Sequence, residues 1–138
     1  MTPSAANGDA FLHALGELTE GLLYPSESDA PLTPFRAELP AGEPLTPERL
    51  LLSLGLPAGT PIETTTVDDV LGPFAVAEEG AGDEDRAEAE RYRRIMDALS
   101  GLTDLQAYRV GKVDIDVYLL GRDASGAWIG LKTHAVET

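Results

Sequence analysis

The segment AYRVGKVDIDVYLLGRDASGAWIGLKTHAV, residues 107–136, has the clearest secondary-structure pattern in this chain of 138 residues. It contains three strand-like runs, at 107–110, 113–122 and 128–136, separated by turn residues. In the middle run, the side chains expected on one face are apolar: Val113, Ile115, Val117 and Leu119. The opposite face begins with Asp114 and Asp116, so we expect it to be only partly covered. The segment predicts an antiparallel β-meander.

Before the meander, a first helix is predicted over residues 10–23. Asp9 is a suitable N-cap, and apolar residues recur at helical spacing at Phe11, Leu15, Leu18 and Leu22. Pro25 ends the helix because proline lacks an amide hydrogen and restricts the preceding residue. We expect residues 1–8 to be a flexible tail and residues 9–138 to form a single domain.

The middle of the chain predicts further helices and two strands. Thr46 is a suitable N-cap for a helix that ends at Gly55, with Leu45 and Leu50 as a hydrophobic staple. Strands are expected at 35–39 and 62–67, and Asp68 is expected to cap a short helix. The last helix is predicted over 83–100 from its apolar stripe. The fold class is therefore α+β, with helices packed on a mostly antiparallel sheet.

Composition excludes several classes of function. The chain has 24 acidic and 10 basic residues, a net charge of −14, and no cysteine. Such a charge argues against direct binding of nucleic acid or an anionic membrane and favours a basic protein surface, although many proteins are acidic only for solubility. Absence of cysteine removes disulfides, thiol catalysis and cysteine metal sites. No signal peptide or membrane-spanning run is recognisable, so we expect a cytoplasmic protein.

The sequence contains few residues in patterns typical of catalysis. His13 and His134 are far apart in sequence and have no neighbouring set of ligands, so both are expected to be solvated or structural. Asp114 and Asp116 could hold a cation or act in acid–base chemistry, but such a pair in an acidic protein is more often a solvated sheet face. We expect a protein that is not an enzyme.

Two features fit protein recognition better. The turn at residues 26–29 would project Glu27 between Ser26 and Ser28, although serines and Asp29 are also ordinary turn residues. The end of the last strand would hold Glu137 and Thr138 near the sheet, unless these residues fray. Thr138 carries a hydroxyl group and an α-carboxylate, which are oxygen ligands of the kind that Mg²⁺ accepts.

These residues carry a resemblance to a known family. GLLYPSES at 21–28, continuing to Phe35, resembles the first motif of the nuclease A inhibitor family. YRVGKVDIDVYLLG at 108–121, followed by SGAWIGLKTHAVET, is similar to the closing meander of that family. The resemblance covers close to half the chain. It implies an α–β–α sandwich and inhibition of a metal-dependent, sugar-non-specific endonuclease by a monomer that binds one target molecule.

The resemblance also implies roles for single residues. Thr138 would reach the catalytic Mg²⁺ of the nuclease, and Glu27 would pair with one of its arginine or lysine side chains. The metal ion then belongs to the target, and this chain needs no cofactor. The family's central contact between an acid and an aromatic residue does not transfer, because residues 75–90 contain no tryptophan. The generic acidic candidates there are Glu78, Glu79, Asp83, Glu84 and Asp85.

Other functions remain open on the sequence alone. The chain could be a non-inhibitory adaptor that kept the fold and lost the target, which the missing aromatic contact would favour. It could also mimic DNA toward another basic protein. A hydrolytic enzyme has the least support.

Overall fold

The computed structural model describes residues 7–138 of the chain. The elements, in chain order, are α1 (Gly8–Thr19), β1 (Leu23–Tyr24), β2 (Ala30–Pro31), β3 (Thr33–Arg36), α2 (Pro47–Ser53), β4 (Ile62–Thr65), α3 (Val67–Leu71), the 3-10 helix η1 (Gly72–Phe74), α4 (Asp83–Leu99), β5 (Thr103–Val110), β6 (Asp114–Arg122) and β7 (Trp128–Val136). None of these helices is long and apolar enough to cross a lipid bilayer. Most of the expected N-terminal tail, residues 1–6, lies outside the described range, and Gly8 already belongs to α1.

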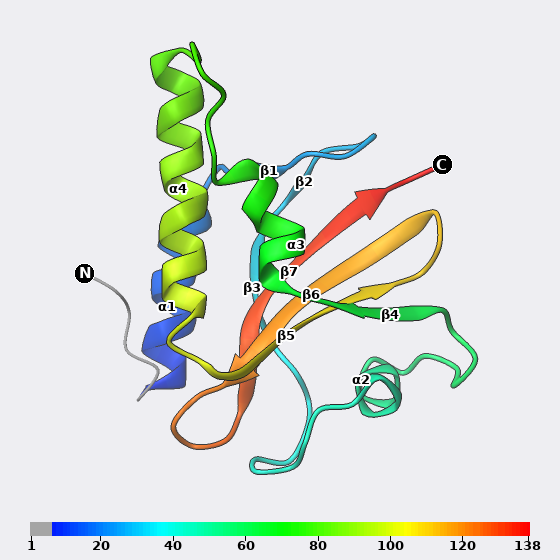
Figure 1. Cartoon of the computed structure of the whole chain (residues 1–138). Coiled ribbons are helices and arrows are strands. Elements are labelled where there is room, and N and C mark those ends of the chain that lie inside the picture. The colour runs from blue at the N-terminus through cyan, green and yellow to red at the C-terminus, as the bar shows by residue number, and fades with distance from the viewer. Residues whose placement is uncertain (1–6) are drawn as a thin grey trace.

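The predicted β-meander is confirmed as the centre of a five-stranded antiparallel sheet. The strand order is β3-β7-β6-β5-β4, so the meander β5–β6–β7 is flanked by two edge strands from earlier in the chain (Figure 1). In the register, Val117 of β6 lies opposite Thr133 of β7 and Arg109 of β5. One face of the sheet therefore carries the odd-numbered positions of β6, β7 and residues 106–110 of β5, and the other face carries the even-numbered positions. Before Gln106 the register of β5 shifts by one residue, so that Thr103 lies opposite Arg122.

Both faces of this sheet are covered, which gives the α–β–α layering that the resemblance implies. The helices α1, α3 and α4 lie on one side in Figure 1, and α2 lies on the other. The first core contains Phe11, Leu15, Val70, Tyr92, Ile95, Val117, Leu119 and Leu131, among others. The second core contains Leu45, Leu50, Leu51, Tyr108, Tyr118, Leu120 and Trp128. Beyond this second core, Asp114 and Asp116 leave the end of the sheet partly open, as predicted.

A second, two-stranded sheet was not predicted. In it β1 pairs antiparallel with β2, with Leu23 opposite Pro31 and Tyr24 opposite Ala30. Two buried tyrosines fix this hairpin: the Tyr92 hydroxyl group donates to the Leu23 carbonyl at 2.8 Å, and the Tyr24 hydroxyl group donates to the Val70 carbonyl at 3.3 Å. The tip of the hairpin consequently points toward the end of β7 (Figure 1).

Several predicted boundaries are wrong by a few residues. Asn7, rather than Asp9, caps α1, because its Oδ1 accepts hydrogen bonds from the amides of Asp9 and Ala10. The helix ends at Thr19 instead of 23, and Gly21 then turns the chain with a positive φ of 73°.

Other boundaries also differ. The strand expected at 62–67 ends at Thr65, and the run expected at 107–110 begins at Thr103. The strand expected at 35–39 is observed at Thr33–Arg36, because only these residues pair with β7 in register. Thr66, rather than Asp68, caps α3, and its hydroxyl oxygen accepts from the amide of Asp69 at 3.0 Å. The predicted cap at Thr46 is confirmed for α2.

Candidate functional site

Glu27 and Thr138 meet at the end of β7, although they are far apart in sequence. The Thr138 hydroxyl group donates a hydrogen bond to Oε1 of Glu27 at 2.7 Å. The backbone amide of Thr138 donates a second bond to Oε2 of the same carboxylate. Both residues are exposed to solvent. The two residues expected to contact a target therefore form one anionic feature at the surface.

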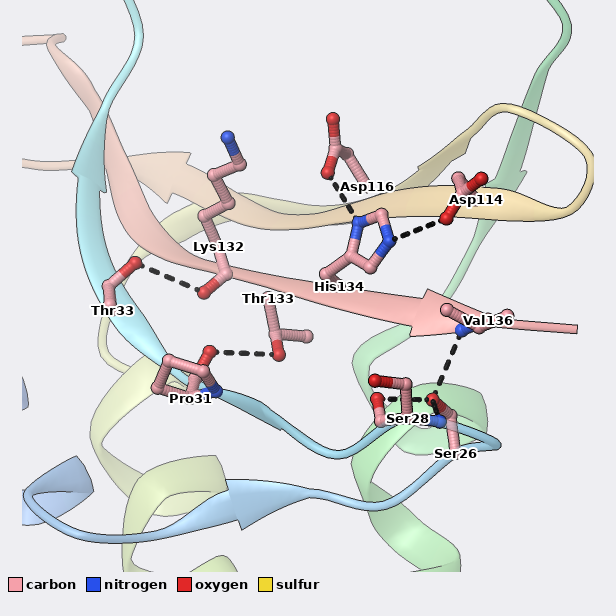
Figure 2. Close-up of polar contacts among 10 residues, drawn as sticks. All are labelled: Ser26, Ser28, Pro31, Thr33, Asp114, Asp116, Lys132, Thr133, His134 and Val136. Carbon is pink, nitrogen blue, oxygen red and sulfur yellow. Dashed lines mark hydrogen bonds and ion pairs between the residues drawn. The ribbon is translucent and has the colours of Figure 1, made fainter.

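The turn that carries Glu27 is bonded to the end of β7. The Ser26 hydroxyl oxygen accepts a hydrogen bond from the Val136 amide at 3.1 Å, and the Glu27 amide donates to the Val136 carbonyl at 3.3 Å. Figure 2 shows Ser26 and Ser28 directly below Val136. The Ser28 hydroxyl group makes no side-chain hydrogen bond within residues 7–138, and Ser28 is exposed. Of the two serines, Ser28 is thus the one whose hydroxyl group is open to a partner.

The carboxylate of Glu27 is held in its ionised form. Its pKa is lowered first by the hydrogen bond from the Thr138 hydroxyl group and then by the bond from the Thr138 amide. Both bonds go to the charged form, which is why they favour it. At neutral pH the site therefore carries a full negative charge on Glu27.

Glu137 lies beside this pair but has an internal partner. Its amide donates to the Val113 carbonyl at 2.9 Å, which fixes the chain on the β6 side of β7. Its carboxylate forms an ion pair with Arg109 of β5. The charge of the Glu137 carboxylate is thus partly neutralised by Arg109. Of the two residues predicted to bind a partner here, Thr138 is therefore the more available for contact.

The acidic central residues line two adjoining hollows next to the hairpin. Glu78, Glu79, Asp85 and Glu88 contribute to the first hollow. Asp29, Glu84 and Glu88 contribute to the second, so the side chain of Glu88 borders both. Since Asp29 is the last residue of the turn that carries Glu27, the surface with negative charge extends from the end of β7 to the first turns of α4. Asp83 borders neither hollow and instead pairs with Arg86 at 2.6 Å.

Two residues of this acidic surface were missed by sequence reasoning. Glu88 stands four residues after Glu84 in a predicted helix, so the i, i+4 spacing already placed both on one helix face. Asp29 was seen only as a turn residue, and its position beside α4 depends on a tertiary contact. Arg91 also borders the second hollow, but its guanidinium group donates to the carbonyls of Leu18 and Glu20.

His134 lies between the two aspartates that the sequence analysis singled out. Its Nδ1 is 2.8 Å from Oδ1 of Asp116, and its Nε2 is 3.4 Å from Oδ1 of Asp114 (Figure 2). The pKa of His134 is raised, mainly by the hydrogen bond with Asp116. Within residues 7–138, no group of three or more His, Cys, Asp or Glu side chains has the geometry to hold a metal ion. His13 is exposed and pairs with Glu17 at 2.8 Å.

The sequence of this chain matches a known protein family. The family described as "Nuclease A inhibitor-like protein" matches residues 9–138, a range that includes the Ser26–Asp29 turn, α4 and the end of β7. No curated protein matches the chain.

Proposed function

Because the chain belongs to the nuclease A inhibitor-like family, we propose that it inhibits a metal-dependent, sugar-non-specific endonuclease by occupying its active-site cleft. The observation that carries this proposal is the contact between Glu27 and Thr138, which presents a carboxylate and a hydroxyl group together. A cleft that binds phosphate offers cationic side chains and a divalent metal ion, and these two groups suit both.

Thr138 is the residue proposed to reach the metal ion of the nuclease. Its hydroxyl proton is directed to Oε1 of Glu27, so the lone pairs of the hydroxyl oxygen remain free on the outer side. Mg²⁺ prefers oxygen ligands, and a hydroxyl group that donates to a carboxylate is a more electron-rich ligand than a free one. The divalent ion is part of the target in this proposal.

Glu27 is proposed to bind a cationic side chain of the nuclease. Each of its carboxylate oxygens accepts one hydrogen bond from Thr138, and a carboxylate has about four acceptor positions. Positions thus remain for an arginine or lysine, and a charge-assisted bond of this kind can anchor an interface. Because the pKa of Glu27 is lowered, the carboxylate is charged when the target arrives.

The acidic surface around Glu88 is proposed to guide the encounter. A negative field complementary to a basic cleft raises association rates more than it raises affinity. Glu78, Glu79 and Glu84 would contribute in this way, without the aromatic contact that the central segment lacks. We propose a complex of one inhibitor with one nuclease and an interface of about 1,200–2,000 Å².

A nuclease assay tests the proposal. The protein is titrated into a purified sugar-non-specific endonuclease of the ββα-metal class, with DNA and RNA as substrates and Mg²⁺ present. We expect the wild type to inhibit both activities, Thr138→Val to weaken inhibition about tenfold, and Glu27→Lys to weaken it about a hundredfold through like-charge repulsion. Thr138→Ser, which keeps the hydroxyl group, and Glu38→Lys, beside the start of β7, serve as matched controls.

The outcomes separate the function from the site. Absence of inhibition by the wild type would contradict the function for that nuclease class. Undiminished inhibition by both Thr138→Val and Glu27→Lys would instead leave an inhibitor whose contacts lie elsewhere.

A second candidate is mimicry of DNA toward another basic protein. The two acidic hollows around Glu88 favour it. Phe74 is the only aromatic residue among those that line them, so they offer little apolar surface that would select one target. Binding to unrelated basic proteins that disappears above about 0.3 M salt would support this function, since exposed charges are then screened.

We also infer that the protein acts by binding and carries out no catalysis. Both ring nitrogens of His134 face carboxylates of the same protein, so this imidazole is not directed at a nucleophile. Measuring hydrolysis of DNA and RNA by the purified protein alone checks the inference, and turnover that is lost in His134→Asn would contradict it.

A further inference from the structure

The hydroxyl group of Ser26 has no hydrogen-bonding capacity left for a partner. It donates to the Ser28 carbonyl at 2.9 Å and accepts from the amides of Val136 at 3.1 Å and Ser28 at 3.2 Å. A serine hydroxyl group has one donor and two acceptor positions, so all three are used. Ser26 is also only partly exposed, whereas Ser28 is exposed. A role of Ser26 in binding would have to be indirect.

These bonds attach the turn to a strand edge that β3 does not reach. The register of β3 with β7 covers Ile129–Lys132, and the Thr133 hydroxyl group then bonds the Pro31 carbonyl at 3.0 Å. At Val136 both backbone polar groups face the turn. The amide donates to the Ser26 hydroxyl oxygen (Figure 2), and the carbonyl accepts from the Glu27 amide. The Ser26 hydroxyl group thus stands in for the carbonyl that a longer β3 would supply.

The attachment continues through Glu27 to Thr138. With the turn fixed at Val136, the Glu27 carboxylate lies where it accepts from the amide and the hydroxyl group of Thr138. Without that attachment, the same two bonds would require ordering an exposed four-residue turn and an exposed chain end at once. Ordering the backbone of even one residue lowers the equilibrium constant for forming such contacts about tenfold.

We propose that Ser26 is a positioning residue that orients Thr138 through Val136 and Glu27 and makes no contact with the target. The orienting role belongs to the free protein. Its consequence for inhibition rests on the proposed function, because it assumes that Thr138 is the group that the nuclease binds. Ser26 then raises affinity by reducing the freedom that Thr138 would lose on binding.

The first test uses the free protein. In Ser26→Ala, we expect amide hydrogen exchange at Val136 to quicken and the backbone order parameter of Thr138 to fall from that of a rigid segment toward a flexible one, below about 0.6. Ser26→Thr, which restores the hydroxyl group, is expected to retain order. Ser28→Ala is the matched control and should change neither quantity. Unchanged exchange and order in Ser26→Ala, with the rest of the spectrum native, would overturn the proposal.

The second test is a double-mutant cycle in the nuclease assay described above. Ser26→Ala is expected to weaken inhibition about five- to tenfold in the wild type and less than about twofold in Thr138→Val, where the oriented hydroxyl group is already absent. An equal loss in both backgrounds would mean that Ser26 acts independently of Thr138 and would overturn the proposal. A general loss of stability would give that equal loss, so the cycle separates positioning from folding.

The two tests also separate this proposal from the function on which it rests. If the wild type inhibits no nuclease of this class but Thr138 becomes mobile in Ser26→Ala, the proposed function fails and the orienting role stands. If the wild type inhibits and Thr138 keeps its order in Ser26→Ala, the function stands and the orienting role fails.

Discussion

Thr138 donates its hydroxyl proton to Glu27 at 2.7 Å, although 111 positions separate the two residues in sequence. The bond joins the turn of the β1–β2 hairpin to the segment that follows β7, so it forms only after the sheet has its final register. A property of Glu27 that depends on this bond therefore reports on the whole site.

The ionisation of Glu27 is the first such property. The pKa of Glu27 is lowered by the hydrogen bonds from Thr138. The stability that these bonds contribute is therefore complete above the ordinary pKa of a glutamate, and it is lost as pH falls through the lowered pKa of Glu27. We expect Thr138→Val, which removes the hydroxyl bond but keeps the amide bond, to raise the pKa of Glu27 part of the way to its ordinary value. Carbon-detected NMR titration of the Glu27 carboxyl group measures this. An unchanged midpoint would show that the hydroxyl bond is absent in solution.

The acidic hollows should affect how fast the complex forms. Replacing Glu84 and Glu88 by glutamine removes two charges beside the hairpin without adding bulk. We expect the association rate with the nuclease to fall about three- to tenfold at low salt, with little change in the dissociation rate, because steering acts before contact. Surface plasmon resonance at about 0.02 M and 0.3 M salt measures both rates and the screening.

The control for this prediction removes the same number of charges elsewhere. Glu38→Gln with Glu48→Gln changes two exposed acids, one between β3 and α2 and one within α2, an element that lies away from the end of β7 (Figure 1). If this pair slows association as much as Glu84→Gln with Glu88→Gln does, net charge rather than the acidic hollows governs the encounter.

The hairpin should depend on one buried hydroxyl group. Tyr92 is fully buried, and Tyr92→Phe would leave the Leu23 carbonyl without the donor that bonds it at 2.8 Å. We expect a loss of about 1–3 kcal/mol in the free energy of unfolding, measured with urea. Tyr118→Phe is the matched control, because the Tyr118 hydroxyl group makes no hydrogen bond with residues 7–138, and its loss should stay below about 0.5 kcal/mol.

The stability that His134 contributes should depend on pH. Its pKa is raised in the folded state by Asp116 and Asp114, so the contribution is complete below the ordinary pKa of 6.5 and is lost as pH rises through the raised value. We expect the wild type to melt about 1–3 °C above His134→Asn at pH 6, and this gap to close by pH 9. His134 and Asp116 are partly exposed, which keeps this difference in melting temperature small. A difference that grows toward pH 9 would contradict a raised pKa of His134.

The meander was predictable because its information is local. Alternation at Val113–Leu119 gives β6, and the turn residues around Gly126 give the start of β7 at Trp128, as observed. Capping chemistry located α2 for the same reason, since Thr46 and Pro47 are adjacent in sequence.

The rest of the fold and the site depend on contacts between distant segments. The two-residue strands β1 and β2 are too short to show a period, and they exist because Tyr92 and Tyr24 fix them. Sequence reasoning named Glu27 and Thr138 as candidates through a resemblance, but no local rule predicts that one bonds the other. It also grouped Ser26 with the partner-binding residues. The bond from the Val136 amide to the Ser26 hydroxyl oxygen joins residues 110 positions apart, so no local pattern could predict it.

The position of β7 in the sheet has a consequence for how the chain folds. The edge strands β3 and β4 are made early, whereas the strands that they join, β7 and β5, are made late. During synthesis, β3 has no partner until residues 129–132 have left the ribosome, and its pairing closes a loop of nearly a hundred residues. The protein should therefore add β3 to its sheet only after translation of β7, and a nascent chain stalled before Trp128 would expose Phe35 to chaperones.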